Sequence, residues 1–75
     1  MPLQELEVSR IWADVIGIPE ADADTNFFDL GGNSMLLLEL INQLNEKLGI
    51  DTDVLMLLEH PTVAKLTSHV NSLDA

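Results

Sequence analysis

Residues 29–41 read DLGGNSMLLLELI, a stretch in which two glycines lead directly into an apolar segment. Asn33 or Ser34 can cap the first free N–H groups of a helix that starts there. From Leu37 onward, apolar side chains recur at helical spacing. This pattern predicts a helix from Ser34 to about Leu48, with Ser34 at the point where a loop becomes a helix.

Near the start of the chain, Val8, Ile11, Trp12 and Val15 have the same apolar period. This period predicts a helix from about Leu3 to Ile16. Gly17 ends the helix, and Pro19 prevents it from continuing. Trp12 lies on the apolar stripe of that helix. We therefore expect its side chain in the core rather than on a binding surface.

Two short helices are expected after the second one. Gly49 ends the second helix, and residues 53–59 then read DVLMLLE. Periodicity cannot separate helix from strand in so short a run, but the chain has no second strand candidate to pair with it, so a helix is favoured. Pro61 breaks this helix, and Thr62 can cap a last one that ends near Ser72. The predicted structure is all-α.

The connection from Gly17 to Asn33 is long for so small a chain, and long loops in compact domains tend to be functional. Phe27 and Phe28 are the apolar residues best suited to anchor this loop to the core. Adjacent rings cannot easily point the same way, so we expect one in the core and the other on the loop surface. Stacking on a ligand is the less favoured alternative.

The acidic part of this loop resembles the start of a calcium-binding loop. Asp22, Asp24 and Asn26 have the one-three-five spacing of its first ligands. That loop also needs glycine at its sixth position and glutamate at its twelfth, where this chain has Phe27 and Asn33. The calcium interpretation fails at both positions.

The composition limits the class of protein. Seventy-five residues make one domain with a small core, and without cysteine no disulfide or thiolate metal site can support it. His60 and His69 are nine residues apart, which is not the spacing of a compact helical metal pair. Thirteen acidic residues against three basic ones give a net charge of -10. This charge argues against nucleic acid or an anionic membrane as a partner and favours basic protein surfaces.

The start of the chain shows no targeting signal. No basic segment followed by an apolar run comes after Met1, and no apolar stretch is long enough to cross a bilayer. We expect a cytoplasmic, monomeric protein.

Ser34 is the candidate functional residue. A helix N-terminus favours a phosphate esterified to a hydroxyl placed there, because free N–H groups and the positive end of the helix dipole gather at that point. Gly31 and Gly32 permit positive φ angles and let another protein's active site approach the serine closely. An ordinary helix cap after a glycine turn is the alternative interpretation, and the local signal alone favours it, because capping serines are common.

A catalytic role for Ser34 is less consistent with the sequence. Residues 32–36 resemble the start of a nucleophile elbow, but the fifth position is Leu36 where that motif has glycine. The elbow also needs a large sheet, which this helical chain cannot form. Ser34 is then a residue acted upon. Met35 falls among polar residues on the helical wheel, so it is a candidate docking contact, although single exposed apolar residues are common.

Three segments together resemble the phosphopantetheine-dependent carrier proteins, especially the peptidyl carrier domains of nonribosomal peptide synthetases and related acyl carriers. Residues 11–17 read IWADVIG, residues 26–34 read NFFDLGGNS, and residues 59–63 read EHPTV. The resemblance extends over nearly all of residues 1–75, which would form a single carrier (thiolation) domain. It implies a four-helix bundle with a short third helix and a long loop between the first two.

The resemblance also implies a function. A magnesium-dependent phosphopantetheinyl transferase would attach 4′-phosphopantetheine from coenzyme A to Ser34, and the thiol of this arm would hold an aminoacyl, aryl or acyl group as a thioester. The carrier itself would not be an enzyme. Its partners would be an adenylation or other acyl-loading enzyme, condensing or tailoring enzymes, and a thioesterase. Neither nucleic acid nor membrane is among the expected partners.

Partner proteins are expected to dock around the serine, on Asp29, Gly32, Asn33, Met35, Leu36 and Glu39. Carriers of this kind usually have aspartate or histidine before the serine, where this chain has Asn33. Leu36 stands where fatty-acid-type carriers often have an acidic residue, which favours peptide-synthetase partners. A polyketide or fatty-acid-type acyl carrier remains an alternative, and a noncovalent acidic helical adaptor is an alternative of another class.

Overall fold

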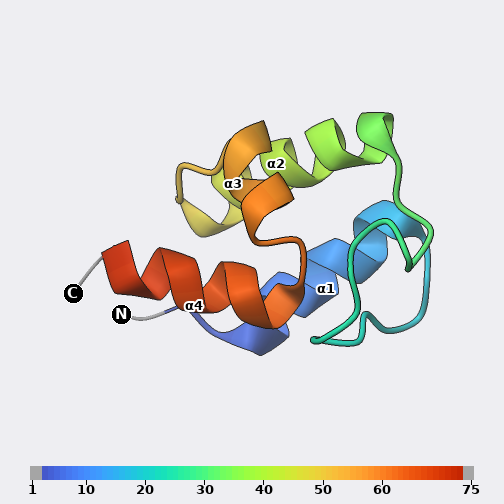
Figure 1. The fold of residues 1–75 in the computed structure, drawn as a ribbon, viewed down its shortest axis with the longest axis horizontal. Coiled ribbons are helices and arrows are strands. Elements are labelled where there is room, and N and C mark those ends of the chain that lie inside the picture. Colours follow the sequence, from blue (N-terminus) through green and yellow to red (C-terminus); the bar gives the residue numbers. More distant parts are fainter. Residues whose placement is uncertain (1–2, 74–75) are drawn as a thin grey trace.

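The computed structural model describes residues 3–73, which form four α-helices and no strand. Figure 1 shows them in chain order as α1 (Glu5–Ile16), α2 (Ser34–Leu48), α3 (Val54–Glu59) and α4 (Val63–Leu73). The predicted all-α fold and the short third helix are confirmed. Within the described residues, no helix is long and apolar enough to cross a membrane.

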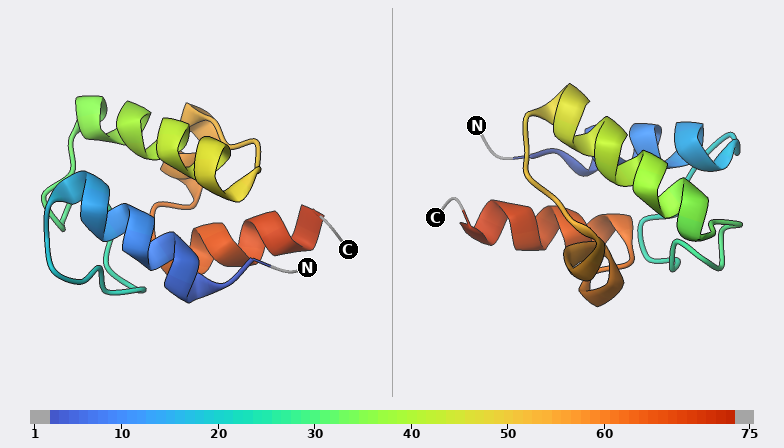
Figure 2. Two further views of the ribbon diagram at one scale, coloured as in Figure 1. Left: turned by 180° about the vertical axis from the view of Figure 1, so that it is seen from behind. Right: turned by 90° about the horizontal axis from the view of Figure 1, so that it is seen from above.

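The helices pack pairwise around one core. Helix α1 lies against both α2 and α4, and α3 packs on α2 (Figure 2). The largest fully buried side chains come from all four helices and the first loop: Trp12, Phe27, Leu40, Leu44, Leu57, Leu66, Val8 and Val63. Trp12 is completely buried, as the apolar stripe of α1 predicted. Its ring meets that of Phe27 edge-on, with centroids 5.6 Å apart.

Glycines end the two long helices as predicted. Gly17 has a φ of 87° and Gly49 a φ of 65°, in the left-handed region that side chains disfavour. The N–H of Gly17 donates to the carbonyl of Ala13 at 2.8 Å, and that of Gly49 donates to the carbonyl of Asn45 at 3.1 Å. These bonds use carbonyl groups that the helix ends would otherwise leave unpaired.

Helix α1 begins two residues later than predicted, at Glu5 instead of Leu3. The N–H of Leu3 donates to Oδ1 of Asn71 in α4 at 2.7 Å, and Nδ2 of Asn71 donates to the carbonyl of Leu3 at 3.0 Å. Leu3 is therefore bound to α4 as extended chain. Gln4, with a φ of -97° and a ψ of 136°, is the residue before the first helical turn.

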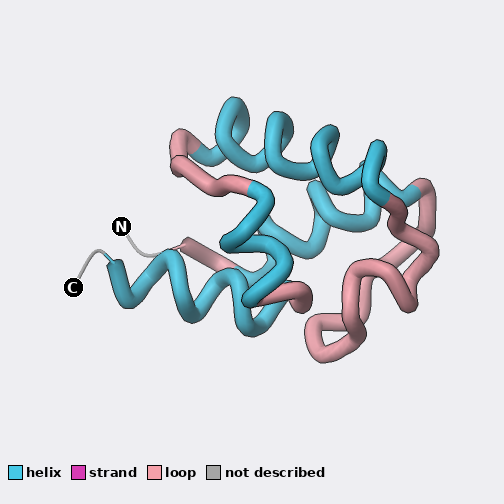
Figure 3. Tube along the Cα trace, turned by 45° about the horizontal axis from the view of Figure 1, so that its top comes forward, coloured by secondary structure: helices cyan, strands magenta, loops and turns pink. Residues whose placement is uncertain are grey.

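The connection between α1 and α2 is the long irregular segment seen in Figure 3. It is attached to the N-terminal end of α4 by two backbone bonds. The N–H of Phe27 donates to the carbonyl of Pro61 at 2.8 Å, and the N–H of Ala64 donates to the carbonyl of Ala23 at 2.9 Å. This segment therefore has a defined path from the core to the start of α2.

Candidate functional site

Asn33 is the residue that caps α2. Its backbone is extended, with a φ of -146°, and its Oδ1 accepts a hydrogen bond from the N–H of Leu36 at 2.9 Å. The sequence left open whether Asn33 or Ser34 does this. Ser34 follows as the first residue of the helix, is exposed, and is not the cap.

The electrostatic setting of Ser34 favours an anion. It stands at the N-terminus of a fifteen-residue helix whose first turn has no acidic side chain. No carboxylate within the first turn therefore offsets the free N–H groups and the positive end of the helix dipole. A phosphate on the Ser34 hydroxyl would lie in a favourable field and in contact with solvent.

The two glycines before the site have different roles. Gly31 has a φ of 111°, in the left-handed region that a glycine permits. Gly32 is not among the positive-φ residues, so it does not use this freedom. Instead, a β-carbon at Gly32 would lie 2.3 Å from Cε2 and 2.7 Å from Cζ of the Phe27 ring. Gly32 is needed because the aromatic ring occupies the space of a side chain.

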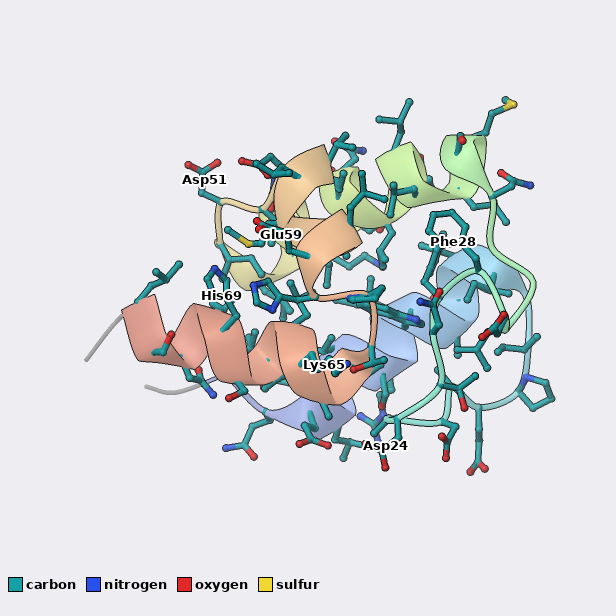
Figure 4. All side chains as sticks on the ribbon, in the orientation of Figure 1. Asp24, Phe28, Asp51, Glu59, Lys65 and His69 are labelled. Atoms are coloured by element: carbon teal, nitrogen blue, oxygen red, sulfur yellow. The ribbon has the colours of Figure 1, made fainter. Side chains whose placement is uncertain are left out.

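The two phenylalanines of the loop separate as predicted. Phe27 is 1% exposed and Phe28 is 41% exposed. Their rings meet edge-on with centroids 5.4 Å apart, and Figure 4 shows Phe28 near the N-terminal end of α2. One ring anchors the loop in the core, and the other lies on the surface close to the candidate site.

Asp22 and Asn26, two of the three residues with calcium-loop spacing, use their side chains in turns of the loop itself. Oδ2 of Asp22 accepts hydrogen bonds from the hydroxyl of Thr25 at 2.8 Å and from the N–H of Asp24 at 3.2 Å. Oδ1 of Asn26 accepts from the N–H of Phe28 at 2.9 Å. These are side-chain turns that stabilise an irregular backbone.

The predicted docking residues do not all lie at the surface. Asp29, Asn33, Met35 and Glu39 are exposed, and Met35 reaches 81%. Gly32 and Leu36 are half-buried, and Leu36 packs against the core.

Other apolar residues are exposed that the sequence did not single out. Leu38 on α2 is 59% exposed, and on α3 Leu55 and Leu58 are 65% and 52% exposed. Leu38 could have been found, because it falls outside the apolar stripe of α2. The exposed side of α3 could not, since its apolar run has no polar face.

The histidines form a contact that their spacing did not predict. The rings of His60 and His69 stack with centroids 4.0 Å apart and an angle of 17° between their planes. His60 is the residue after α3, and His69, labelled in Figure 4, belongs to α4. Among the described residues there is no group of three or more metal-ligating side chains.

Comparison with known proteins gives the family. The family described as "Phosphopantetheine attachment site" matches residues 7–70. The chain belongs to this family. Gramicidin S synthase 2 of Brevibacillus brevis is 34% identical over 73 residues, which cover 95% of this chain and 2% of that protein. Tyrocidine synthase 3 of Brevibacillus parabrevis is 39% identical over 62 residues, 83% of this chain and 1% of that protein. The chain thus spans only a small part of these relatives.

Solved carrier proteins have the same fold. The type-II acyl carrier protein BlmI of Streptomyces verticillus, involved in bleomycin biosynthesis, superimposes with a TM-score of 0.87 at 31% identity, over 95% of this chain and 86% of that one. A peptidyl carrier protein in complex with coenzyme A and the phosphopantetheine transferase Sfp gives a TM-score of 0.85 over 96% and 94% of the two chains. Its identity of 22% makes it evidence for the fold alone.

The family and fold confirm the resemblance seen in the sequence. The chain is a carrier protein of the nonribosomal-peptide thiolation type, and its prosthetic group is 4′-phosphopantetheine. The residues present fit this group, because an exposed serine stands at a helix N-terminus without a carboxylate in the first turn. When bound, the group supplies a terminal thiol on a flexible arm.

Proposed function

We propose that Ser34 is the residue to which 4′-phosphopantetheine is attached. The observation that carries this proposal is the exposed hydroxyl at the N-terminus of α2, next to a cap made by Asn33. The hydroxyls of Ser9 and Ser72 donate to carbonyls of their own helices, and Ser68 lies within α4. Ser34 is therefore the serine best placed for a phosphate.

In this proposal the chain is the substrate of a phosphopantetheinyl transferase and not an enzyme. The oxygen of Ser34 forms a bond to the phosphorus that bears pantetheine, and the bond between the two phosphates of coenzyme A breaks. Adenosine 3′,5′-bisphosphate leaves, and the serine proton passes to the transferase. The chain contributes an accessible nucleophile and a helix end that stabilises the negative charge of the product.

Partner proteins would approach the face that surrounds this serine. The exposed apolar side chains on α2 and α3 form what we call the apolar face: Met35, Leu38, Val54, Leu55 and Leu58. Glu39, Asp53 and Glu59 add negative charge along the same two helices or at their ends. An apolar centre with acidic surroundings fits basic partners that bind briefly, with charge increasing the encounter rate more than the affinity.

The partners proposed for this face are the transferase, an adenylation or other loading enzyme, condensing or tailoring enzymes, and a thioesterase. For the transferase, the support is that a carrier protein of the same fold occurs with that enzyme and coenzyme A in one solved complex. Another solved chain, from McyG, joins adenylation and carrier domains and binds phenylalanyl-adenylate. We also propose that residues 1–75 form a single carrier domain.

The test is intact mass after incubation with coenzyme A, magnesium and a broad-specificity phosphopantetheinyl transferase. We expect one phosphopantetheine per chain, mapped to Ser34. Ser34→Ala should give no addition and an unchanged circular dichroism spectrum, because the exposed hydroxyl is not the helix cap. The matched control is Ser68→Ala, which removes an exposed hydroxyl from α4 and should be labelled like the wild type. Labelling of folded Ser34→Ala would overturn the proposal.

A noncovalent adaptor is distinguished from a carrier by comparing Ser34→Ala with the wild type. It would keep its partner after Ser34→Ala, and the wild type would gain no mass from a competent transferase.

A further inference from the structure

We propose that Phe27 is a positioning residue for Ser34. Its ring and its backbone fix the peptide at Gly32, two residues before the serine, and so set where Ser34 enters α2. This inference rests on the proposed attachment of the prosthetic group to Ser34.

Phe27 is the point at which the first loop is fixed to the rest of the molecule. Its side chain is 1% exposed and meets Trp12 of α1 edge-on, with the ring planes at 86°. Its N–H donates to the carbonyl of Pro61, between α3 and α4, at 2.8 Å. The position of Phe27 is therefore set in part by α1 and by the α3–α4 junction, both outside α2.

Gly32 is held to Phe27 in two ways. The N–H of Gly32 donates to the carbonyl of Phe27 at 3.1 Å. The ring of Phe27 also lies where a side chain of Gly32 would be, 2.3 to 2.7 Å from the place of its β-carbon. Real β-carbons do not approach other atoms this closely, so any side chain at Gly32 must displace either the ring or the peptide that leads to Ser34.

The turn between these two residues has little freedom to absorb such a displacement. The N–H groups of Asp29 and Leu30 both donate to the carbonyl of Asn26, at 3.0 and 3.1 Å. The N–H of Gly31 donates to the carbonyl of Phe28 at 3.3 Å. Successive backbone bonds of this kind transmit a shift at one end of the turn to the other, because each fixes the chain over three or four residues.

The experiment measures labelling kinetics of Gly32→Ala, Phe27→Leu and the double variant with the transferase, coenzyme A and magnesium. Gly32→Ala should lower kcat and kcat/KM together, by up to about 100-fold if the hydroxyl moves by about 1 Å. Leucine lacks two of the three ring atoms that the new β-carbon would meet, Cε2 and Cζ, and its shorter side chain can turn the remaining Cδ away. The double variant should therefore be labelled faster than Gly32→Ala alone, although it carries one more substitution.

Two results with folded Gly32→Ala would overturn the inference. One is labelling at the wild-type rate, and the other is slow labelling that Phe27→Leu does not relieve. If Gly32→Ala does not fold by circular dichroism, Phe27→Leu is compared with Leu44→Val, which removes similar core volume from the distant half of α2. Slower labelling of Phe27→Leu supports positioning, and equal rates overturn it. Failure of the wild type to be labelled would instead overturn the role of Ser34.

Discussion

The two ends of α2 each depend on an asparagine, and the two asparagines have different roles. At the N-terminal end, exposed Asn33 accepts one hydrogen bond, from the N–H of Leu36. At the C-terminal end, half-buried Asn45 makes three bonds to Thr52, which is 4% exposed. Oδ1 accepts from the N–H and the hydroxyl of Thr52 at 2.7 and 2.8 Å, and Nδ2 donates to its carbonyl at 3.0 Å.

This difference shows how a small domain can keep a reactive residue exposed without becoming unstable. The C-terminal end fixes α2 to the following loop through three hydrogen bonds between Asn45 and the buried Thr52. The N-terminal end leaves its helix N–H groups near solvent, and its position comes from Phe27 in the preceding loop. We therefore expect substitutions at the C-terminal end to act mainly on stability and those at the N-terminal end mainly on labelling.

The largest loss of stability is expected for Asn45→Ala. Three bonds to Thr52 disappear, and the N–H and hydroxyl of this buried residue lose their acceptor. The free energy of unfolding should fall by about 3 kcal/mol, the sum expected for buried polar groups left unpaired. Urea unfolding followed by circular dichroism measures this. The control is Asn42→Ala, an exposed asparagine on the same helix, which should change stability by less than about 0.5 kcal/mol.

Labelling kinetics of Asn45→Ala complete the test. The fraction that remains folded should be labelled at the wild-type rate, because Asn45 lies at the other end of α2 from Ser34. A wild-type free energy of unfolding, or a reduced rate for fully folded protein, would contradict the division between the two ends.

A smaller effect is expected at the other asparagine. Asn33→Ala removes one cap bond and should cost about 1 kcal/mol of stability. Asn33→Asp keeps the cap and adds a negative charge at the positive end of the helix dipole, so it should unfold no more easily than the wild type. Urea unfolding of the two variants checks this order. Equal losses of unfolding free energy in both variants would mean that the side chain of Asn33 does not act as the cap.

The sequence predicted features that follow from neighbouring residues. Helical spacing and the glycines at 17 and 49 placed the helix ends correctly except at the start of α1. The separation of Phe27 from Phe28 followed from their adjacency. The candidate serine also came from residues close together in the chain, and the family resemblance came from three short segments, each read as local sequence.

Features that depend on distant residues could not be predicted in this way. Leu3 is bound by Asn71, which is 68 residues away, and α1 begins only after it, at Glu5. The reason for Gly32 is the ring of Phe27, not a positive φ. An apolar period identifies the buried side of each helix, but it does not identify which group on another segment fills a given space.

The smallest effect on stability is expected for Met35→Ala, which is also the sharpest test of docking beside Ser34. The side chain of Met35 is 81% exposed, so its loss should change the free energy of unfolding by less than about 0.5 kcal/mol. If the apolar face contacts the transferase, the KM for the carrier should rise several-fold while kcat changes little, because uniform binding is lost and Ser34 stays in place.

Leu6→Ala supplies the matched control for Met35→Ala, because Leu6 is 61% exposed on α1 and lies outside the apolar face. It removes a comparable exposed apolar side chain and should leave KM unchanged. Equal KM values for the two variants and the wild type would show that Met35 is an ordinary exposed residue. A rise for both would mean that the transferase contacts α1 as well, and the apolar face would then be only part of the docking surface.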